Sequence, residues 1–413
     1  MIMGCGGKCP ERGRFGGRGG QKNTEVFRPL GKKVEGGGCL GEKRTYFPGR
    51  NTLGYSLLEL AAICGELPAG LVCRIPGSGS YKETVLCSLR KGGLLRTYYQ
   101  DRLRGYRLGR KAKGYLLADC PGRFGFYLTG KTDTNRLKCE VSRRVRLHRI
   151  AEVYVAMMNA GVAVFRDEKP AVFAGSRVQA PGMERAAFYS SREVKEMGVE
   201  TVKIRGSRMA GVLLATSGAF IVYNSGPHAA VLDYRAEQRA QVLLQMVLSR
   251  KGFPALQGDG GVSGVLFADS MGHFSDIFME VDSRNRCFFL LDGNYEHFYY
   301  FTNDHYGDVL LRLLCDTGRR EELDRILIQG LCESNGGFVV ENDAMDENGN
   351  PVLFGYFLDI PRINRFCTAL QLQDRRGTII CFDFQKEALA HLCGGQMELS
   401  AISFEKFERR FFP

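Results

Sequence analysis

The strongest constraint on the fold is a run of short apolar segments, divided by glycine and proline, between residues 51 and 120. Apolar residues recur there at the spacing of one face of a helix. This spacing predicts a first helix that ends near Gly65, a second from Pro68 to Arg74 and a third from Ser80 to Lys91. These three helices occupy about 40 residues.

A β-hairpin is predicted after the third helix. Strands are expected at residues 94–100 and 106–108 around a turn at 101–105, with one more short helix at 110–118. Three helices and a hairpin within about 60 residues have the element order of a winged helix-turn-helix. The sequence therefore predicts a winged helix at residues 51–120.

The rest of the chain predicts a mixed α/β module. One apolar stripe between residues 136 and 162 predicts a linking helix. Beyond it, apolar strands such as 287–291 alternate with helices such as 233–250, and no internal repeat is apparent. We therefore expect an α+β protein, in which the N-terminal winged helix-turn-helix is followed by a mixed α/β C-terminal module of unknown role at 163–413.

The first 50 residues have a different composition. They contain 14 glycines and an Arg-Gly-Gly-like stretch that begins at Arg14. Such a segment buries too little apolar surface to offset its ordering entropy, so we expect a disordered tail. The tail could add phosphate contacts, or it could be passive or an artefact of the assigned start. No apolar stretch has the length of a membrane span or of a secretion signal, so a soluble cytoplasmic protein without a membrane partner is expected.

The net charge of +12 is unevenly distributed. Residues 76–150 carry 18 Lys/Arg and 5 Asp/Glu, a net of +13, whereas residues 151–413 sum to −7. A surface that is charged only for solubility would spread its charge evenly. A basic front on an acidic back is typical of a protein that binds a polyanion with one module. We therefore expect the acidic C-terminal part not to bind DNA by itself.

The predicted winged helix assigns roles to these basic residues. In this fold the start of the third helix faces base edges in the major groove, and the hairpin, or wing, lies along the phosphates. Double-stranded DNA is therefore the expected partner, and a winged domain used for protein contacts is the alternative. The candidate DNA contacts are Ser80, Tyr81, Lys82, Thr84, Arg90 and Lys91 on the helix, and Arg96, Arg102, Arg104, Arg107, Arg110 and Lys111 on and after the wing.

Several segments also resemble a known group. The runs at residues 54–66, 94–99 and 146–152 resemble winged-helix proteins of bacterial conjugative and integrative elements, and are similar to the replication-relaxation family. The resemblance continues through residues 188–195, 291–298 and 380–385, and covers most of the chain from about residue 51. It implies DNA binding in the replication or mobilisation of a mobile genetic element, or in its transcriptional control. It supplies no catalytic residue.

An enzymatic alternative depends on four acidic residues. Some winged-helix proteins of mobile elements carry a nuclease-like domain that holds a divalent metal with acids on adjacent strands. The nearest pattern here is Asp276, Glu280 and Asp282, with Glu237 on the preceding helix. Aspartate stands where such sites have lysine, and surface acids on an unrelated fold are the simpler explanation.

Other signatures of enzymes and metal sites are missing. The chain has no P-loop, no G-x-S-x-G elbow and no His-x-His pair, and its 14 cysteines form no C-x-x-C pair. We therefore expect no catalytic residue, metal or cofactor. Three hypotheses stay open: a DNA-binding regulator or accessory factor, a metal-dependent nuclease or nickase guided by the winged helix, and an adaptor that recruits a relaxase or replication protein. The sequence does not indicate an oligomeric state.

Overall fold

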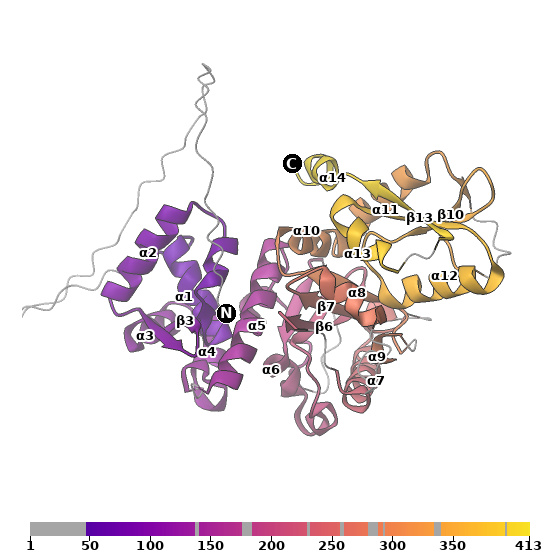
Figure 1. The fold of residues 1–413 in the computed structure, drawn as a ribbon. Helices are drawn as coiled ribbons and strands as arrows, with labels where there is room; N and C mark the ends of the chain where they lie inside the picture. Colours follow the sequence, from indigo (N-terminus) through magenta and orange to yellow (C-terminus); the bar gives the residue numbers. More distant parts are fainter. Residues whose placement is uncertain are drawn as a thin grey trace, which may run out of the picture. The chain divides into compact units, whose positions relative to one another are not determined.

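The computed structural model shows a mixed α+β protein, as the sequence predicts (Figure 1). Thr45–Pro413 form one compact unit. Nearly all of the expected tail at 1–50 lies outside the described part of the chain. The structure describes residues 47–136, 140–175, 184–228, 232–256, 260–279, 288–291, 294–333, 340–392 and 395–413.

The N-terminal region, residues 47–136, packs helices around a small antiparallel sheet of order β1-β3-β2. Thr52 begins the first helix by accepting a hydrogen bond from the backbone N–H of Tyr55 at 3.3 Å, and Gly65 ends it in the left-handed conformation. The elements are α1 (Leu53–Cys64), β1 (Leu67–Pro68), the 3-10 helix η1 (Gly70–Arg74), α2 (Gly79–Lys91), β2 (Leu95–Gln100), β3 (Leu103–Leu108), α3 (Arg110–Asp119) and α4 (Pro121–Leu128).

Two details differ from the sequence prediction. The second helix, expected at 68–74, begins only at Gly70 and is a 3-10 helix, because Leu67 and Pro68 pair with β3. Proline is tolerated there because β1 is an edge strand and needs no N–H on its outer side. The hairpin turn is also tighter than expected. Asp101 and Arg102 alone form it, and both have positive φ angles, of 48° and 65°, as a type I′ turn requires.

Helix α5 (Val141–Asn159) follows the N-terminal region. It begins later than the residue 136 expected for the linking helix; residues 137–139 are outside the described ranges. A polar junction lies at its end. The Asn159 amide donates to the Asp308 carboxylate at 2.7 Å, and Arg74 forms an ion pair with the same carboxylate. Burial raises the pKa of Asp308 to about 6. The junction ties η1 to α5 and to the later helix that carries Asp308.

The first large sheet has the order β4-β5-β6-β7-β8. Its first three strands are antiparallel, and the last two run parallel to the third. The prediction of a strand at 287–291 is wrong, because the described residues 288–291 form a short helix. The elements are β4 (Ala187–Ser190), α6 (Ser191–Val194), the 3-10 segment η5 (Lys195–Ile204), β5 (Gly211–Ala215), β6 (Gly218–Gly226), α7 (Tyr234–Arg250), β7 (Ser263–Ala268), α8 (Gly272–Met279), α9 (Phe288–Leu291), β8 (Phe298–Thr302), α10 (His305–Leu314) and α11 (Thr317–Ile328).

The second large sheet repeats this topology. Its order is β9-β10-β11-β12-β13, again with three antiparallel strands followed by two parallel strands that connect through helices. The sequence did not show this repeat, because strand pairing is a property of the backbone that different side chains can satisfy. The elements are β9 (Cys332–Glu333), β10 (Ala344–Met345), β11 (Pro351–Phe354), α12 (Ile360–Gln373), β12 (Gly377–Phe382), α13 (Lys386–Ala390), β13 (Met397–Ile402) and α14 (Phe404–Phe411).

Equivalent helices of the two sheets contact each other. Ser275 of α8 donates to the carbonyl of Ala388 in α13 at 3.0 Å, and each of these helices precedes the last strand of its sheet. His305 of α10 lies 2.6 Å from Glu408 of α14, and each of those helices follows the last strand. Contacts between equivalent elements are characteristic of an isologous pair.

Two large apolar clusters form the core. One combines the N-terminal helices and α5 with one face of the first sheet, and the other combines the opposite face with α7 and α12. Because the first cluster crosses from the N-terminal region into the sheet, these parts share buried apolar surface. Within the described ranges, no helix is both long enough and apolar enough to span a membrane.

Candidate nucleic-acid interface

Helix α2 presents a polar surface to solvent. Its inner side buries Leu86 and Leu89, and this burial fixes the helix against the N-terminal core. Five of the candidate contacts on this helix are solvent-exposed: Ser80, Tyr81, Thr84, Arg90 and Lys91. Tyr81 is 53% exposed, which is unusual for a large aromatic side chain. The Thr84 hydroxyl donates to the carbonyl of Ser80 at 2.9 Å, so its methyl group stays available on the surface.

Lys82 is buried, contrary to the sequence prediction that it contacts DNA. Its side chain is only 6% exposed, and its ammonium group donates to the carbonyl of Cys73 at 3.0 Å. Because that carbonyl belongs to η1, Lys82 joins η1 to the start of α2. Lys82 is therefore not a candidate contact to a base.

The hairpin carries its exposed cations on β2, at the turn and on the outer half of β3. Arg96, Arg102 and Arg104 are all exposed. Tyr99 lies opposite Arg104 in the strand register and is 71% exposed, so an aromatic ring and a guanidinium share one face near the turn. Arg110 and Lys111 are exposed at the start of α3.

A shared property of these cations is that they lack acidic partners. Throughout the described ranges, six exposed residues of α2, the hairpin and α3 form no ion pair: Arg90, Lys91, Arg96, Arg102, Arg104 and Arg110. A protein surface normally places acids among its bases. An uncompensated set of this kind produces a positive potential that attracts a polyanion.

Arg107 is also buried, although the sequence predicted that it contacts DNA. It lies on the central strand β3, is 4% exposed, and its guanidinium lies 2.9 Å from the Glu66 carboxylate. The guanidinium also forms a cation–π contact with Tyr98, with 5.1 Å between the guanidinium carbon and the ring centroid. A buried, paired guanidinium cannot reach a phosphate, so Arg107 is not a candidate contact.

Glu66 is the centre of a buried charge cluster that the sequence did not indicate. Arg144 and His148 of α5 join Arg107 there, with nitrogen-to-oxygen distances of 2.7 and 2.9 Å to the Glu66 carboxylate. Burial alone would raise the pKa of Glu66. The hydrogen bonds from His148, Arg144 and Arg107 outweigh it and lower the pKa to about 2. Glu66 therefore stays ionised, as its cationic partners require.

The same cluster holds the hairpin in place. The Arg144 guanidinium also donates to the carbonyl of Tyr98 on β2, at 3.3 Å, and to that of Leu103 on β3, at 3.1 Å. One arginine of α5 thus contacts both strands of the hairpin and the Glu66 carboxylate. The hairpin is a braced element, which reduces the conformational entropy that it would lose on binding a ligand.

Of the four acidic residues proposed for a metal site, Glu237 and Asp276 lie in the described ranges. Glu237 is fully buried, and its carboxylate accepts hydrogen bonds from the Ser207 hydroxyl, the Arg208 N–H and the Tyr223 hydroxyl, at 2.6, 2.6 and 3.1 Å. Asp276 lies on helix α8, not on a strand.

Glu280 and Asp282 are outside the described ranges. Among the residues that the structure describes, no group of three or more His, Cys, Asp or Glu side chains could hold a metal ion. Glu237 is explained by its hydrogen bonds, which join α7 to the segment before β5.

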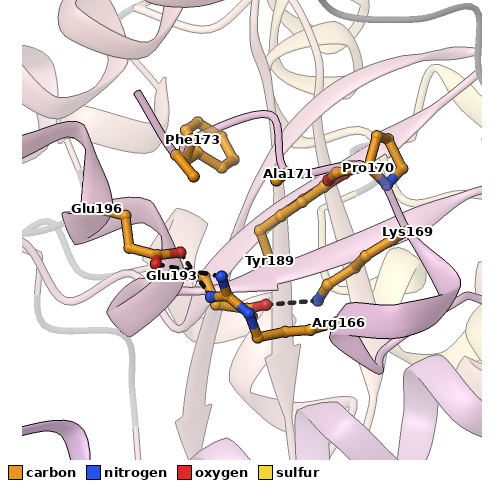
Figure 2. Close-up of a pocket in the computed structure, with 9 residues that line it drawn as sticks. Arg166, Lys169, Pro170, Ala171, Phe173, Tyr189, Glu193 and Glu196 are labelled. Atoms are coloured by element: carbon orange, nitrogen blue, oxygen red, sulfur yellow. Dashed lines mark hydrogen bonds and ion pairs between the residues drawn. The ribbon is translucent and has the colours of Figure 1, made fainter. Parts of the chain in front are cut away.

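Figure 2 shows a small pocket beside β4, where Lys169 points toward Glu193. The Lys169 ammonium group donates to the carbonyls of Val164 and Phe188 and pairs with Glu193 at 2.9 Å. All three of its N–H donors are therefore used, so Lys169 is not free to act as a nucleophile. Arg166 pairs with Glu196 at 2.6 Å across the same pocket.

This cluster is a structural feature that sequence reasoning missed. One signal was present: Ser190 and Glu193 have the S-x-x-E spacing of a capping box, and the structure contains that box at α6. The buried partner of Glu193, Lys169, could not be inferred because it lies 24 residues earlier in the chain.

Comparisons with known proteins add no relative: no protein-family model matches the chain, and no curated protein or solved structure matches it significantly.

Proposed function

We propose that the protein binds double-stranded DNA through a winged helix formed by α1, η1, α2 and the β2–β3 hairpin. One observation carries the proposal: six exposed cations on α2, the hairpin and the start of α3 lack ion-pair partners in the described ranges. The element order supports it, because α2 stands in the position of a reading helix and the hairpin in that of a wing.

The exposed side chains divide into two kinds of contact. Ser80, Tyr81 and Thr84 are exposed at the start of α2, where the residues of a reading helix meet base edges. Arg96, Arg102 and Arg104 are exposed on the hairpin, where contacts go mostly to phosphates. The division predicts sequence preference from α2 and salt-dependent affinity from the hairpin.

The test is duplex binding by matched pairs of variants. The double variant Arg96→Ala/Arg104→Ala removes two exposed hairpin cations. Its control, Arg235→Ala/Arg239→Ala, removes the same charge from the exposed surface of α7. Fluorescence anisotropy with a labelled duplex should show about a tenfold loss of affinity for the hairpin variant and less than a twofold change for the control. Equal losses would mean that only net charge matters, and would contradict the proposal.

The resemblance to proteins of conjugative and integrative elements supports a wider role. We propose that DNA binding serves the replication or mobilisation of such an element, or its transcriptional control, and that a relaxase or replication protein is a further candidate partner. Enrichment of genomic fragments on the purified protein, followed by sequencing, tests this. Recovered fragments should come from the origin, the mobilisation region or a promoter of an element. Fragments without any common region would contradict the wider role.

A further inference from the structure

A second group of cations lies outside the proposed winged helix. Arg143 and Arg146 are exposed on α5, Arg192 is half-buried on α6, and Lys195 is exposed at the start of η5. None of the four forms an ion pair in the part of the chain that the structure describes. We call these four residues the α5–α6 cluster.

The four charges are close enough to act on one another. Burial lowers the pKa of Arg192, and the positive charge of Arg143 lowers it further. Partial burial also lowers the pKa of Lys195, together with the charges of Arg146 and Arg192. Like charges at this range repel one another, and a bound anion would relieve that repulsion.

Arg192 carries an unsatisfied hydrogen-bond donor. Its Nη1 atom is buried, yet has no hydrogen-bond partner among the described residues. Buried nitrogen donors in folded proteins almost always have an acceptor. The neighbouring acid Glu193 is not available, because it already pairs with Lys169 and caps α6. The buried side chains of Tyr154, Tyr127 and Cys64 also act on Arg192, so its Nη1 atom lies toward the protein interior and only the rest of the half-buried side chain is open to a ligand.

Two residues of the cluster lie on the helix that contacts the hairpin. Arg144 donates to the carbonyl of Leu103, so the first turns of α5 lie against the end of the hairpin. Leu103 stands between Arg102 and Arg104, and Arg143 precedes Arg144 in the chain. Arg143 and Arg146 therefore lie on the helix that contacts the hairpin, and their charges act on Arg192 and Lys195.

We propose that the α5–α6 cluster binds backbone phosphates of the same DNA duplex, beyond the stretch that the hairpin contacts. This inference rests on the proposed DNA binding. It also gives a DNA contact to the part of the chain after residue 162, which the sequence predicts not to bind DNA by itself. The net charge of −7 over residues 151–413 is an average, and Arg192 and Lys195 form a local exception to it.

The test compares a short with a long duplex. A duplex of about 10 base pairs, about 34 Å long, spans only the winged-helix contacts, and one of about 30 base pairs extends over the cluster. The variant Arg146→Ala/Lys195→Ala changes two exposed residues, and Arg235→Ala/Arg239→Ala is again the control. We expect about a tenfold loss on the long duplex, a salt slope that is shallower by about two, and unchanged binding of the short duplex.

Arg192→Gln is a second, independent variant, and it should produce the same pattern provided that its thermal melting is that of the wild type. Loss on both duplexes, or on neither, overturns the inference while leaving DNA binding by the wild type intact. Failure of the proposed function has a different signature, because the wild type then does not bind the short duplex. Stabilisation by inorganic phosphate without any difference between the two duplexes would also overturn the inference, in favour of a small-anion site.

Discussion

Two arginines of the hairpin lie directly opposite each other and have opposite environments. Arg96 on β2 pairs in register with Arg107 on β3, so both side chains leave the same face of the sheet. Arg107 is on the central strand, where α5 covers it and Glu66 neutralises it. Arg96 is on the edge strand and stays exposed without an ion pair in the described ranges. Strand position decides which arginine stabilises the fold and which is free for a ligand.

The same contrast extends over the molecule. Beside the second sheet, Arg362 and Arg365 of α12 both pair with Glu341, and Arg362 also pairs with Asp343. On α4, Arg123 pairs with three acids of other segments. Cations there hold distant parts of the chain together, whereas the exposed cations of α2 and the hairpin hold nothing in the described protein. The exposed cations without an ion pair in the described ranges are therefore the ones that are available to a ligand.

The largest expected effect follows from removing the charge of Glu66. Glu66→Gln keeps the size of the side chain but leaves Arg107 and Arg144 buried without a compensating charge. We expect the free energy of unfolding to fall by about 3–5 kcal/mol. Chemical denaturation measures this value. A loss below about 1 kcal/mol would mean that the cluster does not brace the hairpin.

The cluster should also produce a stability that depends on acid pH. The pKa of Glu66 is about 2 in the folded protein and 4.5 for an unperturbed glutamate. The stabilisation is complete above pH 4.5 and is lost as the pH falls toward 2, because the unfolded chain binds the proton first. The expected loss is about 3 kcal/mol. The free energy of unfolding, measured by chemical denaturation at several pH values between 4.5 and 2, should fall steeply with decreasing pH for the wild type and less steeply for Glu66→Gln. Equal slopes would contradict this account.

An intermediate effect separates two neighbours on α2. Tyr81→Ala should weaken binding to a preferred DNA site by about 1–3 kcal/mol and leave binding to random duplex nearly intact. Lys82→Met should leave sequence preference unchanged and destabilise the fold by about 1 kcal/mol, because it removes the hydrogen bond to the Cys73 carbonyl. Competition binding and thermal melting distinguish the two. Loss of sequence preference in Lys82→Met would restore the sequence-based role of Lys82.

The smallest effect on stability is expected at Arg96. Arg96→Ala removes an exposed side chain without an ion pair in the described protein, so its unfolding free energy should change by less than about 0.5 kcal/mol. Its DNA affinity should nevertheless fall, and its salt slope should become shallower by about one. Arg107→Ala should show the reverse pattern, with a large loss of stability. If both variants lose stability equally, the contrast between edge and central strand is wrong.

The sequence predicted the helices and hairpins whose periodicity is local. It found α2, α3, α7 and the β2–β3 hairpin to within a few residues, because capping residues and apolar spacing lie inside each segment. It failed where distant pairing decides the outcome. Pro68 belongs to a strand only because β3 accepts it, and the repeated topology of the two large sheets depends on strand order, which no short segment encodes.

The candidate site divides in the same way. Residue type and predicted position were enough to identify the exposed cations at 90, 91, 96, 102, 104 and 110. They were not enough to identify Lys82 and Arg107 as buried residues, since burial there depends on η1 and on Glu66. Arg144 and Arg192 were likewise missed, because their partners and surroundings come from segments far away in the chain.

The central claim is most directly tested by the salt dependence of duplex binding. If the six unpaired cations of α2, the hairpin and α3 each neutralise one phosphate, the logarithm of the affinity of wild-type protein for a short duplex should fall against the logarithm of the salt concentration with a slope near −5. The slope should become shallower by about two in Arg96→Ala/Arg104→Ala and remain unchanged in Arg235→Ala/Arg239→Ala. A flat response in the wild type would contradict DNA binding through this surface.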